Sequence, residues 1–261
     1  MFKWTEPWVL FEVKQDGFQT LTIPVSAKYK IELVAPGRKI NIFTNDPGVR
    51  IIGTFELKKG QRITAALGQR SKDALGTKSD GGCGGSFLVL ESDLGQKPLL
   101  IAGGAGSAKD EEFARGNINQ AASGNEIVGT SGKQLFHDGE KEDIYCGGAG
   151  YYEAPRVSNL VEGCVAPKSY KDGLIGGKGV GEFRRVTEGG FGGGGGSYNR
   201  VVNGKSKWYF GAGGGFTGGG TKVDEHQWGC MGGGGGSFSA DRNAEFDHKY
   251  VKYGYCKIEK L

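Results

Sequence analysis

Residues 189–196 read Gly-Gly-Phe-Gly-Gly-Gly-Gly-Gly, and this stretch decides the fold of the chain. Two further tracts follow at Gly211–Gly220 and Gly229–Gly236, and Gly81–Gly85 is a shorter one near the start. Glycine has no Cβ and loses the most conformational freedom on folding, so such tracts alone would be flexible. They either serve as linkers or pack side by side as polyproline II helices, which have three residues per turn and no internal hydrogen bonds.

The exits of three tracts favour the packed arrangement. The tracts end in Gly85-Ser86-Phe87, Gly196-Ser197-Tyr198 and Gly236-Ser237-Phe238. A serine followed by an aromatic residue at each exit indicates a repeated structural junction. Flexible Gly/Ser linkers carry no such aromatic residues. We therefore expect a folded bundle of polyglycine helices rather than a linker.

Single large side chains interrupt the glycines, and a bundle would bury them at its margin. They are Phe191, Phe216 and Met231. The glycines that we expect in the bundle are Gly82, Gly84, Gly85, Gly192, Gly193, Gly194, Gly195, Gly196, Gly213, Gly214, Gly215, Gly218, Gly219, Gly220, Gly232, Gly233, Gly234, Gly235 and Gly236.

The composition is that of a folded chain with an unusual glycine content. Glycine accounts for 51 of 261 residues, far above the usual share of about 7%. Seven prolines and the lack of a Gly-X-Y period exclude a collagen triple helix, while 14 Phe, 10 Tyr and 4 Trp can fill a core. The net charge of +4 is mild and spread along the chain. The sequence therefore predicts neither a nucleic-acid partner nor a membrane surface.

Three sequence features bear on localisation: apolar runs, the N-terminal residues and the cysteines. The sequence has no run of about 18 apolar residues, so it predicts no transmembrane helix. Residues 1–7 lack the apolar region of a signal peptide, so we expect either a chain that is not exported by that route or a trimmed form. Five cysteines are an odd number, and Cys146 and Cys164 bracket a short segment. They predict a disulfide if the compartment is oxidising.

The first hundred residues predict β-strands. Apolar and polar residues alternate in Phe18–Pro24 and in Tyr29–Val34, which predicts strands there. A hairpin is predicted from the two apolar runs Phe87–Glu91 and Pro98–Ala102. Short strands spaced near ten residues are typical of a β-sandwich or jelly roll. The strand-like segment Tyr250–Glu259 is expected to pair with this N-terminal sheet. We therefore predict an all-β jelly roll of residues 1–102 plus 249–261, with residues 103–248 as a glycine-rich insertion.

Several segments resemble the extracellular glycine-rich region of the anaplastic lymphoma kinase and leukocyte tyrosine kinase receptors. They are residues 23–31, 48–57, 67–69, 87–104 and 187–191. The resemblance implies an extracellular, tumour-necrosis-factor-like jelly roll with an inserted bundle of polyglycine helices. In that family the region binds a small cytokine and dimerises the receptor. This chain carries no kinase or membrane segment, and no cytokine-contacting residue can be carried over to it.

The sequence contains only partial matches to motifs that bind phosphate, dinucleotides or zinc. Gly176-Gly177-Lys178-Gly179 lacks the Ser or Thr that ends a phosphate-binding loop, and no amphipathic helix follows the strand-then-glycine segment Leu99–Gly106. His226 and Cys230 are four residues apart, but no second ligand pair has zinc spacing. The sequence predicts no catalytic residue, cofactor or metal site.

Two functions are compatible with these observations. The first is a non-enzymatic structural protein that self-associates or packs into an extracellular matrix, filament, coat or mineral-associated assembly. The alternative is a protein-ligand-binding module similar to a receptor tyrosine kinase ectodomain. The expected partner is thus either another copy of the chain, in an oligomer or polymer, or a protein ligand.

Overall fold

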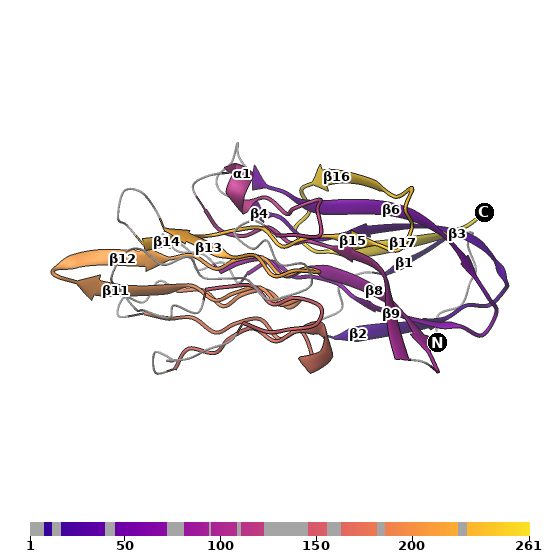
Figure 1. The fold of residues 1–261 in the computed structure, drawn as a ribbon, viewed down its shortest axis with the longest axis horizontal. Coiled ribbons are helices and arrows are strands. Elements are labelled where there is room, and N and C mark those ends of the chain that lie inside the picture. Colours follow the sequence, from indigo (N-terminus) through magenta and orange to yellow (C-terminus); the bar gives the residue numbers. More distant parts are fainter. Residues whose placement is uncertain are drawn as a thin grey trace.

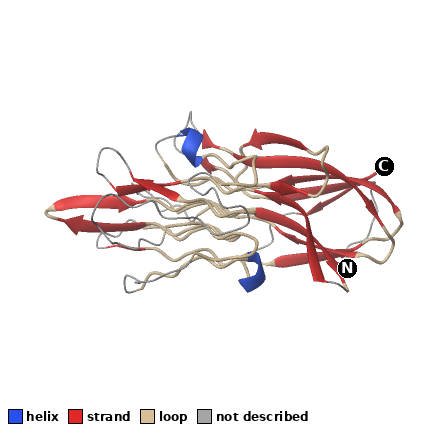
Figure 2. Cartoon of the chain, in the orientation of Figure 1, coloured by secondary structure: helices blue, strands red, loops and turns tan. Residues whose placement is uncertain are grey.

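The computed structural model describes residues 8–11, 17–39, 45–71, 81–93, 95–108, 111–122, 146–155, 163–181, 186–223 and 229–261. Strands dominate this part of the chain, which confirms the all-β prediction (Figures 1 and 2). Its helices are single turns, α1 (Glu111–Ala114) and the 3₁₀ helix η1 (Tyr170–Asp172). Neither has the length or the apolar character needed to cross a membrane.

One sheet contains both the N-terminal and the C-terminal strands. Its five strands are antiparallel, in the order β1-β17-β3-β6-β16. β17 lies between β1 and β3, which confirms the predicted pairing of the last strand with the N-terminal sheet. The bounds are β1 (Trp8–Phe11), β3 (Ala27–Val34), β6 (Gly48–Leu57), β16 (Glu245–Lys249) and β17 (Tyr255–Lys260).

The second sheet is also antiparallel, in the order β15-β9-β8-β7-β2. The predicted hairpin is confirmed as β8–β9. β15 and β16 come from residues 238–249, most of which the sequence assigns to the insertion, yet each pairs with a strand of a main sheet. The bounds are β2 (Phe18–Thr22), β7 (Arg62–Ala66), β8 (Ser86–Ser92), β9 (Gly95–Ala102) and β15 (Phe238–Ser239).

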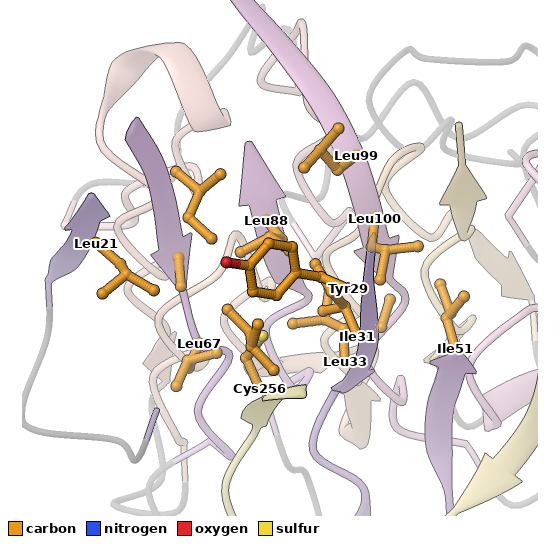
Figure 3. Packing of buried hydrophobic residues seen from close by; sticks show 14 of the residues in the cluster. Leu21, Tyr29, Ile31, Leu33, Ile51, Leu67, Leu88, Leu99, Leu100 and Cys256 are labelled. Atoms are coloured by element: carbon orange, nitrogen blue, oxygen red, sulfur yellow. The ribbon is translucent and has the colours of Figure 1, made fainter. Parts of the chain in front are cut away.

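The two sheets form a sandwich around one hydrophobic core (Figure 3). On β3 the alternation places Tyr29, Ile31 and Leu33 inside, each 0% exposed. Leu88 and Leu100 of the second sheet pack in the same cluster. Burial of side chains of this size stabilises the fold by about 1.5–3 kcal/mol each.

A third, mixed sheet lies at the other end of the long axis (Figure 1). Its longest hairpin turns at Asn203 and Gly204, whose φ angles of 50° and 73° suit a two-residue primed turn. The strand order is β10 (Val180–Gly181), β11 (Tyr198–Val202), β12 (Lys205–Tyr209), β14 (Gly229–Gly232) and β13 (Thr221–Val223).

A buried ion pair connects the sandwich to a glycine-containing segment. Arg38 and Asp46 lie on the short paired strands β4 (Arg38–Lys39) and β5 (Asn45–Asp46). Arg38 Nε is 3.0 Å from Asp46 Oδ2, and their side chains are 9% and 0% exposed. The Arg38 guanidinium also donates to Ser107 Oγ and to the carbonyl oxygen of Ala108. The pair therefore connects the strands before β6 to the segment after β9.

Replacing one partner of this buried pair should be costly. Asp46→Asn keeps the size of the side chain but removes the negative charge that lies 3.0 Å from the buried Arg38 guanidinium. We expect the free energy of unfolding to fall by about 3 kcal/mol or more, measured by urea denaturation. The control Glu112→Gln breaks the exposed 3.4 Å pair with Arg115 and should cost less than about 1 kcal/mol. Equal losses in the two variants would contradict the assignment.

Candidate functional site

Six glycine-rich segments lie between the sandwich and the third sheet, where Figure 2 draws extended loops side by side; one of the segments begins with β14. We call them the glycine core. Its segments are residues 81–85, 103–107, 146–150, 189–197, 211–220 and 229–237. All the glycines that the sequence predicts for the bundle are described, and all are buried.

Hydrogen bonds from residues 212–216 repeat with a period of three. Residues 212 and 215 donate to one neighbouring segment, 213 and 216 to a second, and 214 to a third. A β-strand would instead repeat with a period of two. The bonds are Ala212 N to Cys146 O at 2.7 Å, Gly213 N to Gly233 O at 2.8 Å, Gly214 N to Cys83 O at 2.9 Å, Gly215 N to Ala149 O at 3.3 Å and Phe216 N to Gly236 O at 2.8 Å.

The first glycine segment has the same period. Gly82 and Gly85 both donate to residues 192–195, whereas Cys83 donates to Ala105 and Gly84 donates to Gln69. Each segment is thus bonded to neighbours on several sides. Backbone groups that are buried away from water are paired in this way.

Only glycine allows these segments to approach one another. A Cβ at Gly82 would lie closer than 3.0 Å to the carbonyl oxygen of Ala212, and one at Gly84 would lie as close to that of Phe191. Neither residue needs a positive φ. The requirement for glycine at these positions is therefore close backbone packing.

The three serines at the tract exits share one arrangement. Each is buried, and its hydroxyl accepts a hydrogen bond from the backbone of another segment. A strand begins at or directly after each serine. The repeated motif is thus a transition from the glycine core to a sheet. The donors are Gly68 N to Ser86 at 3.0 Å, Thr187 N to Ser197 at 2.8 Å and Gly103 N to Ser237 at 2.9 Å.

Aromatic rings cover one side of the glycine core. Phe191 and Phe216 are buried in a cluster with Tyr151 and Tyr170, whose ring centroids are 4.9 Å apart. The cluster also includes Phe87 and Ile101 of the second sheet, so it joins that sheet to the glycine core.

Met231 is buried in a separate cluster with Ala108 and Ala114. Outside these clusters, Tyr152, Tyr250 and Tyr253 are exposed.

Clefts on the described surface include one beside His248 and one beside β2. One, of about 500 Å³, lies between residues 112–119 and His248, whose Nε2 is 2.8 Å from the carbonyl oxygen of Gly116. The other, of about 350 Å³, lies where β2 meets the glycine core. Phe18 and Ile175 line this second cleft and are 44% and 53% exposed.

A charged cluster centred on Glu32 joins four strands of the first sheet. Glu32 Oε1 accepts hydrogen bonds from Tyr255 at 2.6 Å, Arg50 at 2.9 Å and Lys249 at 3.3 Å. Burial alone would raise the pKa of Glu32, but these donors lower it to about 2. Arg50 also pairs with Asp247 at 2.8 Å. The alternation of apolar and polar residues on β3 predicts that Glu32 lies on the outer face of the sheet. Its partners could not be predicted in this way, because they lie on strands far apart in the sequence.

All five cysteines are free, buried thiols in this structure. Cys146 and Cys164 do lie in one cluster, so the disulfide between them stays a prediction, and Cys230 joins them there. Among the described residues no group of three His, Cys, Asp or Glu side chains could hold a metal ion. His226, weighed as a partner of Cys230, lies outside the described residues.

Comparison of the chain with known protein families finds no match, and comparison with curated proteins finds none.

The close backbone packing can be tested with one methyl group. Gly84→Ala places a Cβ against the Phe191 carbonyl inside the glycine core, and we expect a loss of about 3 kcal/mol or more in the free energy of unfolding. Gly60→Ala is the control, since Gly60 has φ of 87° but open space around it, and should cost about 1–2 kcal/mol. A Gly84→Ala variant as stable as Gly60→Ala would show that the segments are not so closely packed. Urea denaturation measures both.

The Glu32 cluster predicts an acid-sensitive contribution to stability. The folded pKa of about 2 lies below the ordinary value of 4.5, so this contribution is fully present above pH 4.5 and disappears as the pH falls towards 2. We expect Glu32→Gln to lower stability at pH 6 but to flatten its dependence between pH 4.5 and 2. Parallel curves for the two proteins, obtained by urea denaturation at each pH, would be inconsistent with this. An NMR titration of the Glu32 carboxyl group reads its pKa directly.

Proposed function

We propose that this chain is a non-enzymatic structural protein that self-associates or packs into an extracellular assembly such as a matrix, filament or coat. The observation that carries this proposal is the glycine core, in which backbones bond to backbones in several directions. Such packing makes a stiff spacer and uses few side chains. The side chains of the surface are thereby left to contact neighbours in an assembly.

The proposal includes a finer description of the fold. The sandwich would be a tumour-necrosis-factor-like jelly roll, and the glycine core an inserted bundle of polyproline II helices. The three-residue period of hydrogen bonds supports the second point, because polyproline II has three residues per turn. The resemblance to the glycine-rich region of the two receptor kinases supports both points, and it is the basis for proposing an extracellular location.

The edge of the second sheet supports self-association. Within the described part of the chain β2 is the last strand of that sheet, and unpaired strand edges are templates for pairing with another chain. The cleft beside β2 exposes Phe18 and Ile175. Exposed apolar groups of this kind gather at protein–protein contacts. We therefore place the first contact between copies at this edge.

The alternative function is a protein-ligand-binding module. The observation that favours it is the cleft of about 500 Å³ beside His248, which is lined by both charged and apolar groups. Ile118 on its wall is 41% exposed. A ligand of this module would be expected to contact Ile118 rather than the β2 edge.

Solution mass across a concentration series tests the two functions. We expect the protein to grow into large species, measured by light scattering and analytical ultracentrifugation. Phe18→Lys places a charge at the β2 edge and should lower the association constant at least tenfold, whereas the control Ile118→Lys should leave it unchanged. A monomer at every concentration would contradict the structural role and favour the binding module.

A further inference from the structure

Three of the five cysteines meet in one buried cluster. Cys146, Cys164 and Cys230 pack together with Tyr198 and Tyr209. The two remaining cysteines lie outside this cluster, since Cys256 belongs to the sandwich core and Cys83 lies in residues 81–85, another segment of the glycine core. The cluster therefore has one more thiol than a single disulfide can use.

The strand register places Cys230 on the sheet face that packs against the other two cysteines. Val180, Tyr198, Tyr209 and Cys230 are directly opposite one another on successive strands of the third sheet. Residues opposite one another on neighbouring strands point to the same face of a sheet. On this face the row packs against Cys146 and Cys164, which come from two other segments.

The backbone fixes the positions of both segments. The carbonyl oxygen of Cys146 accepts a hydrogen bond of 2.7 Å from Ala212, which anchors it in the glycine core. Val165, next to Cys164, exchanges backbone hydrogen bonds of 2.8 Å and 3.1 Å with Lys178, two residues before β10. The three thiols are thus carried by three separately anchored segments.

We propose that Cys146 forms an exchangeable disulfide with either Cys164 or Cys230. Cys146 is 1% exposed, whereas Cys164 and Cys230 are each 8% exposed. The two outer thiols are therefore the ones that an external disulfide reaches first, and Cys146 is the inner thiol that resolves the mixed product. The third thiol stays within the cluster and can attack the new bond, which exchanges one disulfide for the other.

The electrostatics support this order of reaction. Burial raises the pKa of Cys146 well above its ordinary value, and the nearby Cys230 and Cys164 raise it further. Burial raises the pKa of Cys230 to about 11, although Lys207 acts in the opposite direction. Since the thiolate is the nucleophile, all three thiols react slowly at neutral pH and faster as the pH rises.

The chemistry balances with glutathione disulfide as the oxidant. An outer thiol loses its proton, and its thiolate attacks one sulfur of glutathione disulfide, releasing one glutathione thiolate. The Cys146 thiolate then attacks the outer cysteine of the mixed disulfide and releases the second glutathione. Two protein thiols are oxidised to one disulfide, and one glutathione disulfide is reduced to two thiols.

The two products tie different parts of the fold together. A Cys146–Cys230 bond would join two segments of the glycine core, residues 146–150 and the end of the core that forms β14, whereas a Cys146–Cys164 bond would connect residues 146–150 to the segment that leads into β10. The exchange would therefore change which segment is covalently joined to residues 146–150.

Peptide mapping after oxidation tests the proposal. The folded chain is incubated with glutathione disulfide at pH 8.5, quenched with acid and digested without reduction. We expect both Cys146 disulfides in the wild type, only Cys146–Cys230 in Cys164→Ala, and only Cys146–Cys164 in Cys230→Ala. Cys256→Ala removes a thiol from another cluster and should keep the wild-type pattern.

Two outcomes would overturn the proposal. One is glutathione retained on Cys164 or Cys230 with no disulfide to Cys146, and the other is a single Cys146 disulfide whose partner never changes. Circular dichroism and thermal unfolding establish that each variant is folded before oxidation. The measurement does not depend on self-association, so either result leaves the proposed structural role untouched.

Discussion

Backbone hydrogen bonds between extended segments hold the middle of this protein together, and at the closest approaches these bonds require glycine, because a Cβ would keep the backbones apart. Gly82 and Gly84 illustrate this, because a methyl group on either would overlap a neighbouring carbonyl. One such bond contributes about 1 kcal/mol net, and ordering a glycine has the largest backbone entropy cost of any residue. The glycine core is therefore stable only as a whole, with each segment bonded to several others.

The sandwich and the glycine core hold together in different ways, and both side-chain and backbone contacts join them. The sandwich depends on side chains such as Tyr29 and Leu100 that fill the space between its sheets. The junctions use polar groups beside the aromatic cluster that joins the second sheet to the glycine core. Ser86 and Ser237 supply hydroxyls where the backbone changes from one bonding pattern to the other, and Arg38 reaches across to Ser107. Substitutions at these junctions should therefore affect both parts.

Local patterns predicted strands of the two main sheets, but not those of the third sheet. Alternation identified the segment that became β3, and two neighbouring apolar runs identified the β8–β9 hairpin, because both signals lie within a few residues. β15 and β16 were missed, since one has two residues and the other is largely polar and exposed, so only their pairing with distant strands defines them. The sequence also did not predict the Glu32 cluster, the clefts beside His248 and β2, or the position of Cys230 near Cys146. Each of these features is built from segments that lie far apart in the chain.

The period of three in the glycine core restricts how such a chain can change in length. Inserting one or two residues into residues 212–216 would turn every later donor by about a third or two thirds of a turn, towards the wrong neighbour. An insertion of three would restore the direction of each bond and, in the proposed polyproline II conformation, lengthen the segment by about 9 Å. Tracts of this kind are therefore expected to gain or lose residues in multiples of three, so that the length of the glycine core varies in discrete steps.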